Sequence, residues 1–283
     1  MAVRQLSETT QLESDEFLEF RDYLQKTVGI NFGLNKQYLV ATRIRKILHQ
    51  HNFKSLRELT CAIQNASNRA VRQQVIDAMT TNETLWFRDG YPFEFLRHMV
   101  LPEFLNKTPH DQIRIWSAAC SYGQEPYSIS MVIEEFARNV FGGSNLQAEI
   151  VATDLSTAAL TTAMRGEYDS MSIARGLTGP RLRSHFDIVD RDVWRVKADI
   201  QNRVKFRQLN LQDGFAAMGK FELILCRNVL IYFSEDLKNK ILNNMSAALK
   251  PGGYLILGSS ESATVNSHFD VVHFHSGVVY RRK

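Results

Sequence analysis

The fold is decided by one stretch of the sequence, residues 113–128 (IRIWSAACSYGQEPYS). It begins as a short apolar strand, passes through small residues and Gly123, and reaches Glu125 and Pro126 just before an apolar helical pattern. Pro126 suits the first turn of a helix, where its missing N–H costs no hydrogen bond. A strand, a tight turn and a helix start in this order are typical of the ligand-binding corner of an α/β sheet.

The residues of this turn argue against a phosphate ligand. The turn contains neither G-x-G-x-x-G nor G-x-x-x-x-G-K, the glycine patterns that cradle pyrophosphates and triphosphates. Glu125 stands in its mouth, where a carboxylate would repel a pyrophosphate but could accept hydrogen bonds from an amino group or a hydroxyl. The turn therefore predicts a nucleoside or amino-acid site.

The composition of the 283-residue chain excludes several classes of protein. No apolar run is long enough to span a bilayer, and the N-terminus lacks the basic-then-apolar pattern of a signal peptide. The three cysteines (Cys61, Cys120 and Cys226) are far apart and form no C-x-x-C motif, which argues against a disulfide framework and a zinc site. We therefore expect a cytoplasmic protein without a metal.

Helical periodicity extends over residues 15–105, with apolar side chains recurring at intervals of three and four. Ser55 and Glu58 form the pattern of a capping box at one of the helix starts. We expect an all-α N-terminal domain over residues 15–90 and a connecting helix or linker over residues 91–112.

Strands and helices alternate from Ile113 onward, which predicts a mostly parallel sheet. Strands are expected at 113–117, 149–153, 204–209, 221–226 and 254–258, helices at 127–139, 156–165 and 235–249, and a C-terminal hairpin at 269–274 and 278–282. Five such strands closed by a hairpin are typical of a class I methyltransferase domain, here residues 113–283. The segment 168–203 breaks the alternation and predicts a small inserted subdomain with a helix at 181–186 and two short strands, 187–189 and 194–197.

Polar residues follow three of these strands at the sheet edge that the turn also occupies. Asp154 ends the second strand, where it could accept both ribose hydroxyls of a nucleoside, or interact with the dipole of the next helix. Asn210 follows the third strand, either beside an adenine or as a turn former. Arg227 and Asn228 follow the fourth, as site residues or as surface partners.

The segment 80–89 (TTNETLWFRD) joins the two regions and allows two interpretations. It is either a helix-capping turn with a buried Trp-Phe pair or a lid over the crevice at the sheet edge.

Four motifs in this order resemble those of the chemotaxis receptor methyltransferase family, CheR. They are Thr81-Asn82-Glu83-Thr84 with Phe87-Arg88, Ser117–Ser128, Ala152-Thr153-Asp154, and Cys226-Arg227-Asn228-Val229 with Tyr232-Phe233. The likeness extends from about residue 15 to the C-terminus. It implies an enzyme that transfers a methyl group from S-adenosylmethionine (SAM) to glutamate carboxylates on the cytoplasmic helices of chemoreceptors. It further implies a cofactor pocket lined by Asn82, Thr84, Arg88, Glu125, Asp154, Asn210, Leu211, Arg227 and Asn228.

The chemistry of this reaction agrees with the residues present. A glutamate carboxylate, with an ordinary pKa of about 4.3, is already a nucleophile at pH 7, so no general base is required. Arg88 or Arg227 could hold a carboxylate of the cofactor or the substrate bidentately. We expect Arg88 and Tyr232 to be catalytic, with Tyr232 shaping the mouth through which the methyl group passes.

Residues 35–52 present a basic helix face that contains no acid. It is either a solvated face, a nucleic-acid contact, or a docking surface for the glutamate-rich helices that the resemblance implies as substrate. No nucleic-acid-binding motif is present. We expect Arg43, Arg45 and Lys46 to steer the substrate electrostatically.

In some CheR proteins the inserted subdomain grips a peptide at the receptor's C-terminus through a hairpin with a glycine-rich turn. Here residues 187–194 (DIVDRDVW) contain no glycine, so we expect an enzyme that works without this tether. We also expect a monomer with no nucleic-acid partner, recruited to membrane receptor arrays only through its substrate. Two alternatives are a methyltransferase acting on RNA and a regulatory module without turnover.

Overall fold

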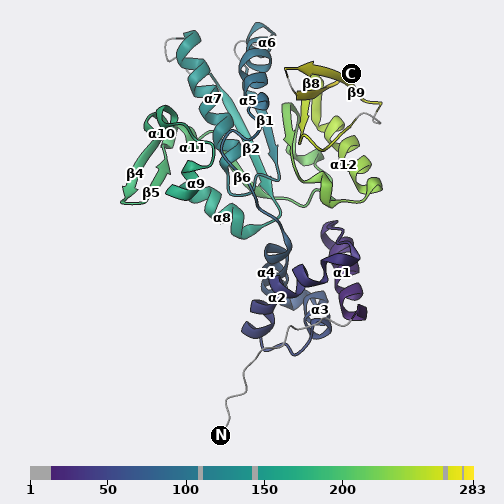
Figure 1. Cartoon of the computed structure of the whole chain (residues 1–283). Coiled ribbons are helices and arrows are strands. Elements are labelled where there is room, and N and C mark those ends of the chain that lie inside the picture. Colours follow the sequence, from purple (N-terminus) through teal and green to yellow (C-terminus); the bar gives the residue numbers. More distant parts are fainter. Residues whose placement is uncertain (1–13, 108–110, 142–145, 264–266, 276) are drawn as a thin grey trace. The chain divides into compact units, whose positions relative to one another are not determined.

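A computed structural model of the chain describes residues 14–107, 111–141, 146–263, 267–275 and 277–283 (Figure 1). The chain divides into two compact units, Met1–Thr80 and Thr81–Lys283, called here the helical unit and the sheet unit. Residues 81–90, which the sequence analysis placed with the helical domain, lie in the sheet unit, because their side chains pack on the sheet and on its insertion.

Over its described residues, 14–80, the helical unit is built from four amphipathic helices and two short 3₁₀ turns. They are α1 (Ser14–Val28), η1 (Leu34–Lys36), α2 (Gln37–Gln50), α3 (Leu56–Gln64), η2 (Ala66–Asn68) and α4 (Arg69–Met79). The Ser55 hydroxyl accepts from the Glu58 amide at 3.1 Å, and Glu58 Oε2 accepts from the Lys54 amide at 2.7 Å. The predicted cap is therefore present, with the carboxylate bound one residue earlier than in a standard capping box.

The sheet unit contains a seven-stranded sheet with the order β6-β2-β1-β7-β8-β10-β9. Its main elements are α5 (Tyr91–Phe95), η3 (Leu96–Val100), α6 (Leu101–Lys107), β1 (Ile113–Ala118), α7 (Gln124–Phe141), β2 (Ala148–Asp154), α8 (Thr157–Arg165), β6 (Val204–Gln208), η4 (Ala216–Met218), β7 (Phe221–Cys226), η5 (Leu230–Tyr232), α12 (Glu235–Ala248), β8 (Leu249–Leu257), β9 (Phe269–Phe274) and β10 (Gly277–Arg282). The first five strands in this order are parallel, and β10 pairs antiparallel with both β8 and β9. This confirms the predicted sheet and hairpin; Ser276, in the expected hairpin turn, lies outside the described residues.

Alternate residues of the central strands face two separate apolar cores. Ile113 and Ile115 pack on one face with residues of α5, η3, α6 and α7, whereas Trp116 and Ala118 pack on the other with residues of α12. Figure 1 shows α7 and α12 on opposite sides of the sheet. Helices on both faces bury both sides of the strands, which explains their nearly continuous apolar sequence.

One strand begins earlier than the sequence predicts. A strand was expected only at 254–258, but β8 already begins at Leu249 and includes the Lys250-Pro-Gly-Gly253 segment. The register with β7 shifts between Phe221 and Leu223. A Cβ at Gly253 would lie 3.0 Å from the Glu222 carbonyl oxygen, so glycine permits the close passage of the two strands.

The inserted subdomain has one strand more than the sequence analysis expected. Its elements are β3 (Glu167–Asp169), α9 (Ser170–Ala174), α10 (Gly179–His185), β4 (Phe186–Asp190), β5 (Val193–Val196) and α11 (Ala198–Gln201), and the three strands form an antiparallel sheet with the order β3-β5-β4. The added strand, β3, has only three residues, too few to show an alternating pattern in the sequence.

Within the described ranges, no helix combines the length and the apolar character needed to cross a bilayer.

Candidate active site

The carboxyl ends of three neighbouring strands bring the candidate residues to one edge of the sheet. Ala118 at the end of β1 pairs with Thr153 of β2 on one side and with Cys226 of β7 on the other. The turn after β1, Asp154 at the end of β2 and Arg227 after β7 therefore meet at one edge, as the sequence analysis expected.

The turn after β1 requires an unusual backbone. Ala119 and Ser121 have φ angles of 59° and 52°, and Gly123 has a φ of 93°. A Cβ at Gly123 would lie 3.0 Å from both the Ala163 Cβ and the Tyr168 hydroxyl. Left-handed non-glycine residues are unfavourable and persist only where surrounding contacts hold them, which is common at ligand sites.

Asp154 is one of the groups that hold this turn. Its Oδ2 accepts from the Ser121 amide and its Oδ1 from the Ser156 amide, both at 2.8 Å, and the residue is 6% exposed. Ser156 is the N-cap of α8, so Asp154 does contact the start of the next helix, as one of the two interpretations expected. Its carboxylate nonetheless lies at the sheet edge beside the turn after β1.

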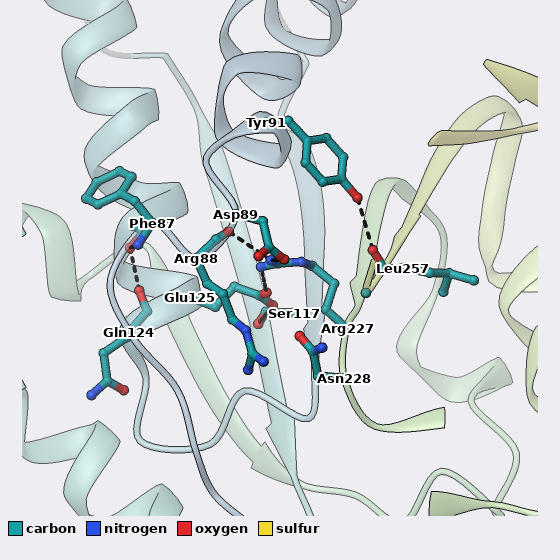
Figure 2. A network of polar contacts seen from close by, with 12 residues as sticks. Phe87, Arg88, Asp89, Tyr91, Ser117, Gln124, Glu125, Arg227, Asn228 and Leu257 are labelled. Atoms are coloured by element: carbon teal, nitrogen blue, oxygen red, sulfur yellow. Dashed lines mark hydrogen bonds and ion pairs between the residues drawn. The ribbon is translucent and has the colours of Figure 1, made fainter. Parts of the chain in front are cut away.

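Arg227 is the centre of a buried polar network that Figure 2 shows from close by. Its Nη1 donates to Glu125 Oε2 at 2.8 Å, and its Nη2 donates to Asp89 Oδ2 at 2.6 Å and to the Arg88 carbonyl oxygen at 2.8 Å. Glu125 Oε1 also accepts from the Ser117 hydroxyl at 2.7 Å. The network joins the start of α7, the end of β7 and the segment before α5.

The charge state of the network follows from these contacts. The Arg227 side chain is 2% exposed, and burial opposes its charge, but Glu125 and Asp89 outweigh this and raise its pKa. A buried guanidinium is tolerated only when such partners compensate for its lost hydration. Arg227 thus remains a cation with two carboxylate partners.

The segment 81–90 is seated on this edge by several contacts. The Ser121 hydroxyl donates to the Asn82 carbonyl oxygen at 2.8 Å, and the Phe87 amide donates to the Ser128 hydroxyl at 3.2 Å. Trp86 is fully buried, and its indole N–H donates to the Ser172 carbonyl oxygen of α9 at 3.1 Å. Of the expected Trp-Phe pair, Trp86 is buried and Phe87 only partly buried, and the main chain of the segment contacts the turn after β1 and the start of α7.

The remaining predicted site residues lie farther along the same edge. Thr84 and Arg88 are half-buried in the segment 81–90, and Arg88 Nη1 donates to the Glu83 carbonyl oxygen at 3.2 Å. After β6, Asn210 Oδ1 accepts from the Gln212 amide at 3.1 Å in a turn, and Leu211 is buried in the core beside α12. Tyr232 ends η5 and is partly exposed.

The three predicted docking residues belong to the helical unit and differ from one another. Arg43 is half-buried, and its Nη1 donates to the carbonyl oxygens of Met79 and Thr80 at the end of α4, at 3.0 and 3.3 Å. Arg45 and Lys46 are exposed on α2. Arg43 therefore holds two helices together, and the exposed charge of this face comes from the other two residues.

Two carboxylates of the site were missed by the sequence analysis. Asp89 is the last residue of the segment 80–89, and no pattern in the sequence indicates that it pairs with Arg227. Glu261 follows β8, and its carboxylate accepts from backbone amides of the turn after β7. The rule that predicted Asp154, an acid just after a parallel strand, would also have identified Glu261.

Comparison with known proteins identifies the family. Residues 82–278 match the family described as CheR methyltransferase, SAM binding domain, and residues 15–80 match CheR methyltransferase, all-alpha domain. Chemotaxis protein methyltransferase Cher2 of Pseudomonas putida is 51% identical over 95% of this chain and 98% of its own length. Chemotaxis protein methyltransferase 1 of Pseudomonas aeruginosa is 50% identical over the same shares. The chemotaxis protein methyltransferase of Vibrio parahaemolyticus is 43% identical over 96% and 98%.

The chain belongs to the CheR methyltransferase family. The resemblance predicted from the four motifs is therefore confirmed, and with it SAM as the cofactor and the class I methyltransferase fold. The protein is a SAM-dependent methyltransferase of the chemotaxis type.

The charges at this sheet edge of the CheR protein fit a cationic cofactor. Four carboxylates (Asp89, Glu125, Asp154 and Glu261) stand against the two guanidinium groups of Arg88 and Arg227, which leaves an excess of two negative charges. SAM carries a sulfonium and an ammonium group against one carboxylate. Within the described residues, Gln124 Oε1 and Asn228 Oδ1 are buried and have no hydrogen-bond partner in the protein, so both can accept from a bound ligand.

Other kinds of catalysis find little support among the described residues of this CheR protein. Cys120 and Cys226 are buried, and burial raises the pKa of each thiol well above its ordinary value, so neither supplies a thiolate nucleophile at neutral pH. No group of three or more His, Cys, Asp or Glu residues in the described parts is placed to hold a metal ion.

Proposed function

We propose that this protein transfers the methyl group of SAM to the side-chain carboxylates of specific glutamates on the cytoplasmic helices of chemoreceptors. The products are glutamate methyl esters, and this protein methylation serves sensory adaptation in chemotaxis. The main support for the proposal is the excess of carboxylates over guanidinium groups at the sheet edge. The relatives of this chain are named chemotaxis protein methyltransferases. A carboxylate acceptor requires no general base, in agreement with the chemistry of the site.

In this proposal the polar residues at the sheet edge hold the cofactor. The residues assigned to it are Asn82, Thr84, Arg88, Glu125, Asp154, Asn210, Leu211, Arg227 and Asn228. Glu125 binds the ammonium group of the methionine part, and Asp154, at the end of β2, binds the ribose hydroxyls. When bound, SAM supplies an electrophilic methyl group on its sulfonium. The chain then has to hold the acceptor in line with that methyl group and exclude water.

The two arginines take different parts in the proposal. Arg227 is 2% exposed and already bound to Glu125 and Asp89, so it serves to fix the network. Arg88 is half-buried and has a carbonyl oxygen as its side-chain partner, so its guanidinium is better suited to bind a carboxylate of the cofactor or of the acceptor glutamate. The sequence alone left these roles undivided.

Tyr232 is the second proposed catalytic residue. Its place at the end of η5, directly after the turn that carries Asn228, supports a contact with the mouth of the crevice. Replacement of Tyr232 by Phe is expected to lower the single-turnover rate of methylation about tenfold through loss of positioning. An unchanged rate would remove the hydroxyl from the mechanism.

Substrate docking is assigned to the basic face of α2. Arg45 and Lys46 are exposed there, and no acidic residue lies on this helix, so the face complements the glutamate-rich helices of a receptor. Arg43 contributes through the packing of α2 against α4. We assign this helical unit, predicted as residues 15–90, to substrate docking and residues 113–283 to methyl transfer, in a monomeric cytoplasmic enzyme recruited to receptor arrays through its substrate.

The proposed enzyme acts without a peptide tether and without nucleic acid. The turn between β4 and β5 consists of Arg191 and Asp192 and has no glycine. Calorimetry with a receptor C-terminal pentapeptide tests this point, because micromolar binding would show that the tether is used.

The acceptor is identified by competition between substrate classes. The full chain is incubated with methyl-labelled SAM in two parallel reactions, one with a chemoreceptor cytoplasmic fragment and one with RNA. We expect label on the receptor fragment alone. Transfer to RNA would favour an RNA methyltransferase, and SAM binding without transfer to either would favour a regulatory module.

A further inference from the structure

A single carboxylate organises the turn that carries Asn228. Glu261 lies just beyond β8, and both of its oxygens accept hydrogen bonds from main-chain amides. The donors are Asn228 at 2.7 Å, Val229 at 2.9 Å, Leu230 at 2.7 Å, Ile231 at 3.3 Å and Gly258 at 2.8 Å. Consecutive amides that converge on one anion form a nest, here filled by a side chain of the same protein.

This nest fixes an otherwise unfavourable backbone. Asn228 has a φ of 58°, in the left-handed region that non-glycine residues seldom adopt. The hydrogen bonds to Glu261 begin at the amide of Asn228 itself and continue over the next three residues. The carboxylate therefore holds the main chain from which the Asn228 side chain extends.

The Asn228 side chain carries a buried acceptor that a ligand could satisfy. Its Oδ1 is buried and has no partner among the described protein groups, and it lies at the sheet edge beside Arg227 (Figure 2). A buried acceptor without a partner is costly unless a ligand satisfies it.

The Glu261 carboxylate is closely packed and accepts from amides on both of its oxygens. A Cβ at Gly258 would lie 2.7 Å from Glu261 Oε2, 2.8 Å from the Asn228 amide nitrogen and 2.9 Å from Asn228 Nδ2. A glutamine at position 261 would have similar size, but its amide NH₂ group would face N–H donors on one side. Only a carboxylate can accept from both groups of amides.

We propose that Glu261 is a positioning residue of the SAM site, which acts by holding the turn that presents Asn228 to the cofactor. The inference rests on the cofactor placement proposed above and does not depend on which acceptor is methylated. The alternative is that Glu261 only stabilises the fold, without an effect on the affinity of folded protein for SAM.

The test is a double-mutant cycle on the full chain, read by calorimetric titration with SAM. The variants are Glu261→Gln, Asn228→Ala and the two combined, and thermal unfolding is followed in parallel. Glu261→Gln is expected to raise the Kd for SAM about tenfold, as loss of charge-assisted hydrogen bonds would. The combined variant should bind no more weakly than the weaker single variant, because both changes remove the same contact.

A matched control separates this effect from a general loss of charge. Glu235→Gln removes an exposed acid in the first turn of α12, whose side chain is 81% exposed and pairs with Lys238. It should leave the Kd for SAM unchanged. Should Glu261→Gln fail to fold, Glu261→Asp, which keeps the charge but shortens the side chain by one methylene and so withdraws it from the amides, is expected to weaken SAM binding in its place.

Each outcome decides a specific point. A folded Glu261→Gln protein with the wild-type Kd, beside a weakened Asn228→Ala protein, would overturn the role of Glu261 alone. Additive losses would also overturn it, because Glu261 would then act independently of Asn228. An unchanged Kd in Asn228→Ala would instead contradict the proposed cofactor placement.

Discussion

Arg227 Nη2 and Asp89 Oδ2 lie 2.6 Å apart, and this contact ties the end of β7 to the segment that covers the turn after β1. The two residues are far apart in the sequence. Because of this pairing, the position of the segment 81–90 depends on the charge of the Asp89 carboxylate.

Replacement of Asp89 by Asn should loosen this segment. The Arg227 side chain, 2% exposed, would retain only Glu125 as a charged partner, and we expect a loss of about 2 kcal/mol in the free energy of unfolding. Urea denaturation measures the loss, and faster amide hydrogen exchange in residues 81–90 locates it. Asp213→Asn, which changes an exposed acid, is the control; equal stability of the two variants would contradict this role of Asp89.

Replacement of Glu125 by Gln should weaken SAM more than its product S-adenosylhomocysteine. The sulfonium gives SAM one more positive charge than the product, and the variant removes one of the excess negative charges from the crevice. The ratio of the two Kd values should shift by a factor of about five, or about 1 kcal/mol of charge interaction. Glu149→Gln, at the opposite end of β2, should leave the ratio unchanged. Equal weakening of both ligands by Glu125→Gln would show that this carboxylate does not sense the sulfonium.

Reversal of the exposed charge on α2 should affect only the substrate. In an Arg45→Glu/Lys46→Glu protein, the KM for a receptor fragment is expected to rise about tenfold at low salt and less at high salt, while the Kd for SAM stays constant. Arg43→Ala is the companion variant, expected to cost about 1 kcal/mol of stability through its lost contacts with the end of α4. A salt-independent KM would argue against electrostatic docking.

A second charged cluster predicts a dependence of stability on pH. Glu135 of α7 forms ion pairs with Arg97 and with Arg181, the latter at 2.8 Å, and His185 lies 3.4 Å away. Burial opposes its charge, but the His185 and Arg181 hydrogen bonds and the charges of Arg181 and Arg97 prevail, and the pKa of Glu135 falls well below its usual range.

A carboxylate whose pKa is lowered by folding stabilises the protein above its unfolded pKa, about 4.3, and this contribution is lost as the pH falls further. Glu135→Gln should therefore cost about 3 kcal/mol at pH 7, as the breaking of a partly buried ion pair does. The difference from the wild type should shrink below about pH 4. Urea denaturation at pH 7, 4 and 3 measures it, and a difference that grows on acidification would contradict the assignment.

The sequence predicts the sheet and one edge of the site well, because both follow from local patterns. Apolar strands alternate with helices, and parallel strands bring their carboxyl ends together, so Glu125, Asp154 and Arg227 were expected at one edge. The partners of these residues were not predictable in the same way. Asp89 contacts Arg227 only through the tertiary fold and carries no sequence signature of that contact. Glu261 follows a strand, so its place at the sheet edge was predictable, but its contacts with the turn after β7 were not.

Two further differences arise where backbone and packing override residue type. The Pro-Gly-Gly sequence before Tyr254 is typical of a turn. Here β8 includes it, because the glycines allow β8 to pass close to β7. Arg43 belongs to a basic face by composition, but its guanidinium turns to the carbonyl oxygens at the end of α4. A charge pattern alone does not separate such a structural arginine from the exposed Arg45.

The central claim, methyl transfer to a carboxylate oxygen, is tested most directly by the stability of the product in alkali. A receptor cytoplasmic fragment is labelled in a single turnover with methyl-labelled SAM, separated from the enzyme and treated with mild base. We predict that the label is released as methanol, because a glutamate methyl ester hydrolyses under these conditions. Label that stays on the fragment after base treatment would place the methyl group on nitrogen or another base-stable site and would contradict the account.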